Sequence, residues 1–137
     1  MIDLKALQDY IDTMFPGLLG VKLEEISSDK VVGSMIVRSA LCTGGETLHG
    51  GAYMAFADTL GAIATTINMP KGARTVTIES KTNFLNGATI GTKIIGEATA
   101  FHKGRNTQVW QTQIRREDGK LCAVVTQTQM VMAPATA

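Results

Sequence analysis

The sequence predicts an α+β fold: an antiparallel β-sheet wrapped around one long central helix, with a short N-terminal helix before it. The first observation is an apolar stretch of 18 residues at positions 50–67, whose one charged side chain is Asp58. A stretch this long and this rich in Ala, Met and Leu favours a helix over a strand. The second is the run of Thr-, Val- and Ile-rich segments after residue 74, separated by short turns, which is typical of antiparallel strands. One helix packed on one such sheet is an α+β arrangement.

Before the central helix, the pattern predicts one helix and two strands. Residues 4–15 have apolar side chains at helical spacing, and Pro16 and Gly17 are expected to end that helix. Apolar and charged residues alternate from 18 to 26 and again from 30 to 37, which predicts a hairpin with its turn at 27–29. Residues 39–48 match no regular element and are expected to form a loop.

The central helix is expected to end at residues 68–72, because the residue before Pro70 leaves the helical region and Gly72 permits a reversal. Four strands are predicted after it, at residues 74–85, 92–101, 108–115 and 121–132. The tail at about 133–137 is expected to be flexible. Residues 1–137 are therefore treated as a single domain, with the N-terminal helix within 1–17.

Composition narrows the class of protein. The 13 Lys and Arg against 12 Asp and Glu leave a net charge of +1, too small a field to recruit nucleic acid. Charged residues make up only 18% of the chain, so a monomer would expose apolar surface and a homo-oligomer is expected. The apolar stretch falls short of the roughly 20 residues of a membrane span and contains three threonines, so protein rather than lipid is expected to enclose it. Cys42 and Cys122 have no metal-ligand spacing, and without a disulfide framework or signal peptide the expected location is the cytoplasm.

The start of the central helix and the acid within it are the candidate chemical groups. Gly50 and Gly51 offer unpaired N–H groups at the positive end of the helix, where a ligand can approach closely and a developing oxyanion can be held. A carboxylate buried in an apolar helix is costly unless it is paired or functional, which makes Asp58 a candidate catalytic residue. Asp58 lies two turns further on the same face, roughly 10–12 Å away. That distance is too long for one substrate atom, so a second subunit or an extended substrate must bridge it.

At these residues the sequence resembles the hotdog-fold acyl-CoA thioesterases of the phenylacetate-degradation (PaaI-like) type. The resemblance covers residues 18–132 in outline and rests on a His-Gly-Gly sequence, on an acid nine residues after the His, and on several later segments. The matching segments are His49-Gly50-Gly51, Phe56-Ala57-Asp58, 75–79, 83–88, Gly91, Gly104-Arg105 and 118–123. Such a family implies dimers that extend the sheet across subunits, commonly tetramers formed as dimers of dimers, and active sites between subunits.

The resemblance also implies an activity and a set of roles. The expected reaction is hydrolysis of an aryl- or fatty-acyl-CoA thioester to free acid and CoA, with no metal and no cofactor, since coenzyme A is part of the substrate. Asp58 would be the nucleophile or the general base. The N–H of Gly51, with Gly50 beside it, would hold the thioester oxygen. His49 would help to place the thioester, and Thr77 would orient water or the acid.

Two parts of the expected site differ from the family or are less specific. Family members often carry Asn or Gln six residues before the His, whereas this chain has Thr43, whose hydroxyl has a shorter reach. Cations near the groove mouth would bind the phosphates of the coenzyme, and the candidates are Lys81, Lys103 and Arg105, with Asn83 beside them.

Two other functions remain open on the same fold. A hotdog hydratase or dehydratase usually pairs a His with an acid and follows the His with Phe-Pro or Asp, whereas Gly-Gly follows it here. A non-catalytic acyl-CoA-binding protein would keep the fold and the pocket without turnover, and Thr43 is the residue that favours it.

Overall fold

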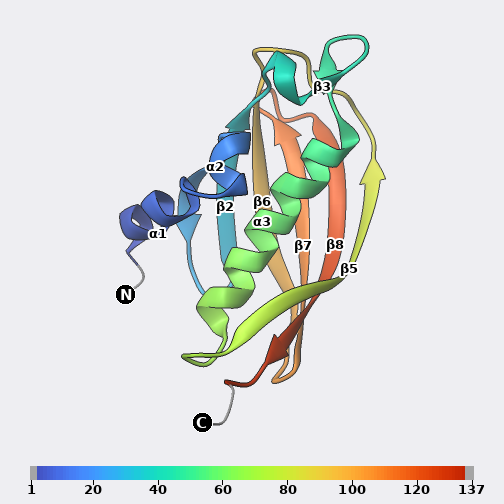
Figure 1. Ribbon diagram of the computed structural model, residues 1–137. Helices are drawn as coiled ribbons and strands as arrows, with labels where there is room; N and C mark the ends of the chain where they lie inside the picture. The colour runs from blue at the N-terminus through green and yellow to red at the C-terminus, as the bar shows by residue number, and fades with distance from the viewer. Residues whose placement is uncertain (1–2, 135–137) are drawn as a thin grey trace.

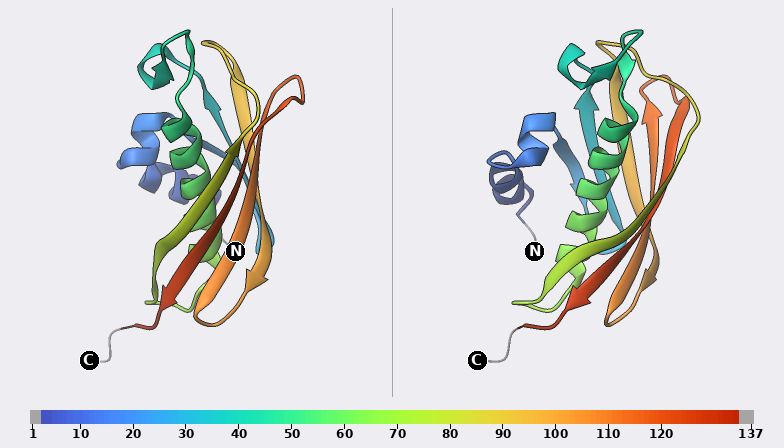
Figure 2. Two further views of the ribbon diagram at one scale, coloured as in Figure 1. Left: turned by 90° about the vertical axis from the view of Figure 1, so that its right-hand side faces the viewer. Right: turned by 45° about the vertical axis from the view of Figure 1, so that its right-hand side comes forward.

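The central helix, α3 (Gly50–Asn68), lies across one face of a six-stranded antiparallel sheet (Figure 1). The computed structural model describes residues 3–134. The long strands curl around the helix, and the N-terminal helices lie on the same side of the sheet as α3 (Figure 2). The predicted helix is present over its whole length, and the predicted arrangement of one sheet around one helix is observed.

The sheet takes two strands from before α3 and four from after it. Their order across the sheet is β1-β2-β6-β7-β8-β5, and every neighbouring pair is antiparallel. The strands are β1 (Lys22–Ile26), β2 (Lys30–Ile36), β5 (Arg74–Phe84), β6 (Lys93–Lys103), β7 (Thr107–Arg116) and β8 (Leu121–Met132). All six correspond to predicted strands. The expected loop at 39–48 contains a short 3-10 helix, η1 (Ser39–Leu41), and a small two-stranded sheet of β3 (Cys42–Thr43) and β4 (Thr47–Leu48).

The N-terminal prediction was wrong in one respect. The single helix expected over 4–15 is two helices, α1 (Leu4–Ile11) and α2 (Phe15–Leu19). Pro16 lies in the first turn of α2, where a missing N–H costs nothing and the fixed φ suits a helix, so it begins a helix here. Gly20 ends α2 in the left-handed conformation at φ 81°, which delays the start of β1 to Lys22.

The core lies between α3 and the sheet. Phe56 and Leu60 of α3 are fully buried. They pack over Gly33 of β2 and Gly96 of β6, where an added Cβ would lie 2.8 Å and 2.7 Å from Leu60. Glycine at these strand positions therefore lets a bulky helix approach the sheet closely.

One face of α3 and one edge of the sheet stay open in the single chain. Asp58 is only partly buried, which corrects the expectation of a buried acid: the sheet covers one side of the helix and leaves the other accessible. Edge strand β5 carries exposed Val76 and Ile78, and its end carries exposed Phe84 and Leu85. Within residues 3–134, no helix combines the length and the apolar character needed to cross a membrane. The two residues before this range and the last three of the predicted tail lie outside the described residues.

Candidate active site

Asp58, near the middle of α3, accepts hydrogen bonds from two side chains of the sheet. The Thr77 hydroxyl on β5 donates to Asp58 Oδ1 at 2.6 Å, and Gln127 Nε2 on β8 donates to the same oxygen at 3.1 Å. The other oxygen, Oδ2, accepts no hydrogen bond from residues 3–134. The structure thus brings the predicted Asp58 and Thr77 together and leaves one carboxylate oxygen available.

A β-bulge in β5 aims Thr77 at the helix. The pairing of β5 with β8 shifts register between Thr77 and Glu79, so one residue of β5 is unpaired there. Before the bulge, the hydroxyls of Thr75 and Thr77 bond to side chains near α3. After it, the buried hydroxyls belong to Ser80 and Thr82, so the inward-facing positions change from odd to even. A bulge of this kind redirects side chains, and here it places one hydroxyl beside the acid.

The start of α3 is held by its own cap residue. His49 is the N-cap, and its Nδ1 accepts a hydrogen bond from the N–H of Gly51 at 2.8 Å. Because Nδ1 is an acceptor, a neutral His49 ring carries its proton on Nε2 and can donate it. The N–H of Gly50 donates to none of the residues in the described part of the chain. The Gly51 N–H already donates to His49 in this chain. Its predicted role as the donor to the thioester oxygen therefore stays a prediction.

Gly50 also allows the end of β5 to approach the helix start. A Cβ on Gly50 would lie 3.2 Å from the Phe84 ring. Phe84 packs edge-on against Tyr53, with ring centroids 6.3 Å apart. Burial, together with the neighbouring Cys122, raises the pKa of Tyr53, so its hydroxyl stays protonated. These contacts fix where β5 ends relative to the Gly50 amide.

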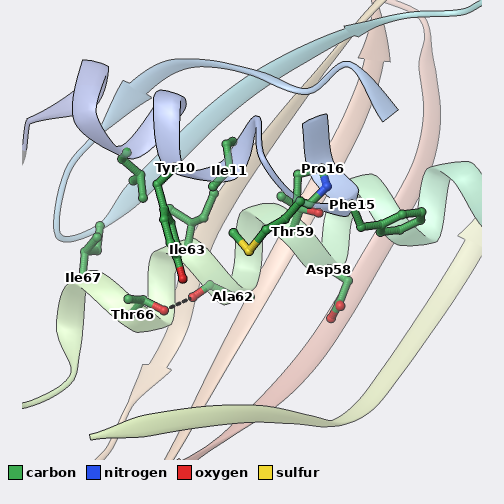
Figure 3. Close-up of a pocket in the computed structure, with 12 residues that line it drawn as sticks. Tyr10, Ile11, Phe15, Pro16, Asp58, Thr59, Ala62, Ile63, Thr66 and Ile67 are labelled. Atoms are coloured by element: carbon green, nitrogen blue, oxygen red, sulfur yellow. Dashed lines mark hydrogen bonds between the residues drawn. The ribbon is translucent and has the colours of Figure 1, made fainter. Parts of the chain in front are cut away.

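Within one chain, the acid and the helix start face different cavities. Asp58 lines a cavity of about 410 Å³ between α3 and the two N-terminal helices (Figure 3). His49 and Gly51 line a second cavity, of about 340 Å³, which lies against α2. Phe15 of α2 borders both cavities, so the two lie next to each other. One chain therefore presents two half-sites.

Comparison with known proteins identifies the family. The model of the family described as "Thioesterase superfamily" matches residues 45–123, which is more than half of the chain. The chain belongs to the thioesterase superfamily. It is 31% identical over 121 residues to the 1,4-dihydroxy-2-naphthoyl-CoA hydrolase of Escherichia coli, covering 88% of each chain.

Solved structures of thioesterases share the fold. A thioesterase of Haemophilus influenzae superposes with a TM-score of 0.93 at 29% identity, covering 99% of this chain and 94% of that one. The E. coli PaaI protein from the phenylacetic acid degradation operon superposes with a TM-score of 0.85 at 22% identity, covering 94% of this chain and 91% of that one. The predictions of a hotdog fold and of a thioester hydrolase are confirmed, and the resemblance to PaaI is confirmed in the fold.

In this thioesterase, the candidate coenzyme-binding residues fall into two groups. Lys81 donates to Asn83 at 2.6 Å, and both lie near the end of β5 that packs on the helix start. Lys103 lies near the other end of α3: its Nζ bonds to the Ser28 carbonyl, which also accepts from Asn68, the last residue of the helix. Lys103 is also paired with Asp29 at 2.5 Å. Arg105 lies exposed in the same turn.

Thr43 lies away from Asp58, in the small sheet that precedes the helix. It pairs with Thr47 across β3 and β4 and is exposed. Its hydroxyl makes no side-chain hydrogen bond to residues 3–134. Its predicted role at the thioester stays a prediction.

Sequence reasoning missed the residues that hold the acid from the sheet. Gln127 and its neighbour Gln129 are buried on β8. The sequence contained a sign of them, because Val125, Gln127, Gln129 and Val131 occupy alternate positions of one strand face. Polar residues at core positions of a strand break the local pattern and often mark a functional site.

Proposed function

We propose that this thioesterase hydrolyses an aryl- or fatty-acyl-CoA thioester to free acid and CoA, at sites formed between two subunits. The observation that carries the proposal is the state of Asp58: Thr77 and Gln127 hold one oxygen, and the other is unpaired beside an apolar cavity. The E. coli relative named as a 1,4-dihydroxy-2-naphthoyl-CoA hydrolase supports a CoA thioester as substrate.

The cavity beside Asp58 suits the acyl part of such a substrate. Its walls are mostly apolar: Leu7 and Ile11 come from α1, and Met14 and Phe15 from the start of α2. Ile63 and Ile67 of α3 line the opposite side (Figure 3). A volume of about 410 Å³ lies within the range of small-ligand pockets. An apolar acyl or aryl group would be stabilised there by burial, with its thioester carbon toward Asp58.

Asp58 Oδ2 has two possible parts in the reaction. As a nucleophile it forms a bond to the thioester carbon and expels the CoA thiolate, leaving an acyl-aspartyl anhydride that water hydrolyses. As a general base it takes a proton from water, whose oxygen attacks the same carbon; the carbon–sulfur bond then breaks, and the CoA thiolate leaves and takes up the proton. In both cases the carbonyl oxygen becomes negative and needs hydrogen-bond donors. Neither route needs a metal or a prosthetic group.

The donors come from the helix start of a partner subunit. The uncommitted N–H of Gly50 and the Nε2–H of His49 would hold the oxygen, and Gly51 would fix the His49 ring. In the same chain these groups are about two turns, or roughly 11 Å, from Asp58. A two-fold axis perpendicular to the two α3 helices would place them antiparallel. If it passes midway between the helix start and Asp58, each helix start faces the other chain's acid.

The open face of α3 and edge strand β5 provide the surface for this dimer. Val76 and Ile78 are 44% and 57% exposed in the single chain, and β5 has an unpaired backbone edge. Joining two β5 edges would continue the sheet and cover these side chains. Two such dimers would associate into a tetramer.

In this dimer, both groups of candidate coenzyme-binding residues would lie near the same helix start. Lys81 and Asn83 lie near the helix start of their own chain. Antiparallel packing brings Lys103 and Arg105, near the far end of one α3, toward the helix start of the other chain. These residues would bind the phosphates of the coenzyme, with Lys103 exchanging its contact with Asp29.

Thiol release from acetyl-, hexanoyl-, palmitoyl- and phenylacetyl-CoA tests the proposal. We expect the wild type to cleave at least one, and Asp58→Asn to lose more than about a hundredfold in rate, since the amide can neither attack nor accept a proton. Asp9→Asn is the matched control, because Asp9 is exposed and pairs only with Lys5 on α1.

The outcomes separate the candidate functions. Equal rates for wild type and Asp58→Asn contradict the catalytic assignment. Tight CoA binding without turnover indicates a binding protein. Hydration of an enoyl-CoA without thiol release indicates a hydratase.

A further inference from the structure

Two buried glutamines lie on the inner face of β8, which faces α3 near Asp58. Gln127 and Gln129 are 1% and 0% exposed. Their inward-facing neighbours along the strand, Val125 and Val131, are apolar and buried. A primary amide at such a position loses its contacts with water and must find protein partners. The partners show what these amides do.

The hydrogen bonds run in one direction toward the acid. The Thr75 hydroxyl has two acceptors within reach, Gln129 Oε1 at 2.9 Å and the Met130 carbonyl oxygen at 3.0 Å, and Gln129 Nε2 donates to Thr77 Oγ1 at 2.6 Å. The Thr77 hydroxyl then donates to Asp58 Oδ1 at 2.6 Å. Because Gln129 already donates to the Thr77 oxygen, the single hydroxyl hydrogen of Thr77 is directed at the carboxylate.

Gln127 reaches the same oxygen by a separate path. Its Nε2 donates to Asp58 Oδ1 at 3.1 Å and lies 3.5 Å from the Asp58 carbonyl oxygen. Its own Oε1 is buried with no hydrogen-bond partner among residues 3–134. An amide turned the other way would put this oxygen against the carboxylate. The carboxylate oxygen of Asp58 therefore determines the orientation, and Gln127 holds Asp58 while leaving its own acceptor unsatisfied.

The helix has a gap that fits Gln127. Gly61 lies three residues after Asp58, and a Cβ there would be 2.4–2.6 Å from the amide atoms of Gln127. Glycine inside a helix is less favourable than alanine by about 1 kcal/mol. The sequence therefore has the less stable helix residue at the one point where the amide must lie against the helix to reach Asp58.

We infer that Gln127 and Gln129 are positioning residues that orient Asp58 so that Oδ2, and not Oδ1, meets the thioester. This inference rests on the proposed role of Asp58. Gln129 acts through Thr77, and Gln127 acts on the carboxylate directly. Neither touches the substrate.

A third buried glutamine allows an experiment to distinguish this positioning role from a role in core packing. Gln108 on β7 is 2% exposed and lies opposite Gln129 in the β7–β8 register. Its Oε1 accepts a hydrogen bond from Trp110 at 3.2 Å, and within residues 3–134 it makes no hydrogen bond to Gln129, Thr77 or Asp58. Gln108→Met is therefore the matched control for the same substitution at the other two positions.

The test measures kcat and KM on the acyl-CoA that the wild type cleaves best. We expect Gln127→Met and Gln129→Met each to lower kcat by about tenfold or more through misplacement of the acid. KM should stay within about twofold, and Gln108→Met should leave both constants near the wild-type values. In a Thr77→Val background, Gln129→Met should have no further effect on kcat, because its path through Thr77 is already broken. Gln127→Met should still lower kcat there.

Thr75→Val gives a second test that leaves the core filled. Thr75 is half-buried and valine has nearly the same shape, so we expect the variant to fold. Loss of this first donor should lower kcat by about threefold, the effect of one ordinary hydrogen bond. If Gln127→Met, Gln129→Met and Thr75→Val all match Gln108→Met in kcat, the inference is wrong even though the proposed function stands.

A spectroscopic measurement decides the inference if the wild type cleaves no acyl-CoA. In Asp58→Ala, the side-chain amide ¹⁵N–¹H resonances of Gln127 should move because their acceptor is gone, and those of Gln129 should follow through Thr77. The Gln108 resonances should move less than either. Equal movement of all three would contradict the hydrogen-bond path, whether or not the protein is a hydrolase.

Discussion

Two parts of α3 are positioned in different ways. At the middle of the helix, Asp58 is held by side chains 19 and 69 residues away in the sequence, on β5 and β8. At the helix start, the Gly51 amide is held by His49, only 2 residues before it. The geometry of the acid therefore depends on how the helix packs on the sheet, whereas that of the donors depends on a local cap. Substitutions at the contacts that Asp58 makes with β5 and β8 should disturb the acid and spare the donors.

After Asp58→Asn, the largest effect is expected at the helix cap, where two substitutions separate stability from chemistry. His49→Ala removes both the acceptor for the Gly51 N–H and the Nε2–H donor. It should lose about a hundredfold in kcat/KM, as loss of one oxyanion donor does. It should also lose about 1 kcal/mol of unfolding free energy, as loss of an N-cap does. Thiol-release kinetics and urea unfolding measure the two.

His49→Asn is the control, because asparagine is a good N-cap but lacks the imidazole Nε2. It should restore the unfolding free energy while the rate stays low. Wild-type kinetics in His49→Asn would show that His49 only caps the helix.

Subunit mixing tests whether the two half-sites belong to different chains. A dimer of one Asp58→Asn chain and one His49→Ala chain has one site with both defects and one with neither. Refolding the two inactive variants together should recover about a quarter of the wild-type rate, since about half of the dimers are mixed and each has one intact site. The rate is followed by thiol release against the separately refolded parents. A mixture no faster than the parents would place the site within one chain.

A smaller effect is expected from closing the gap beside Gln127. Gly61→Ala puts a Cβ 2.4–2.6 Å from the Gln127 amide and must push it away from Asp58. We expect kcat to fall about tenfold from misplacement of the acid. Helix stability should gain up to about 1 kcal/mol before the steric cost.

Gly96→Ala is the matched control between the same helix and sheet. Its Cβ would lie 2.7 Å from Leu60 and 2.9 Å from Phe56, which are packing residues only. It should lower the unfolding free energy by about 1–3 kcal/mol without changing kcat. Full activity in Gly61→Ala would mean that the Gln127 contact is dispensable.

The smallest effect is expected at a second carboxylate that also accepts from a hydroxyl. The buried Ser34 hydroxyl donates to Glu24 at 2.6 Å, and Lys93 lies 3.4 Å from the same oxygen. The Ser34 bond first, and Lys93 second, lower the pKa of Glu24 in the folded state. Its stabilisation is therefore present above its unfolded pKa, about 4.3, and is lost as the pH falls through the lower folded value.

Glu24→Gln should lose less than about 1 kcal/mol at neutral pH, because solvent screens this half-exposed pair. The difference from wild type should shrink toward acid pH in urea unfolding curves, and kcat should not change. A constant difference at all pH values would contradict the assigned cause, and a lower kcat would contradict the distinction between Glu24 and Asp58.

The sequence predicts the helix start better than it predicts the surroundings of the acid. His49, Gly50 and Gly51 are consecutive, so their shared place at a helix start follows from the helix boundary alone. Asp58 stands out because no other charge lies in residues 50–67. Thr77 came from the family resemblance. Gln127 and Gln129 were not found, because a strand pattern shows that a residue faces inward without showing what lies opposite.

Two sequence predictions are wrong because both depend on how neighbouring segments pack. Pro16 was expected to stop a helix, yet it lies in the first turn of a second one; a proline suits either place, and only the path of the neighbouring chain selects one. Asp58 was expected to be buried, since its helix is apolar on every side. The sheet covers only part of the helix, and a single chain leaves the rest open.

The sequence by itself determined the α+β fold, the length of α3, the six strands and the position of the acid two turns from a glycine-rich helix start. These follow from periodicity, turn residues and spacing along the chain, which are local properties. The tertiary structure alone decided the β5 bulge that turns Thr77 toward Asp58, the gap at Gly61, and the amides of β8 that bind one carboxylate oxygen. These depend on strand register and on close helix–sheet packing between distant segments, and neither leaves a local pattern in the sequence.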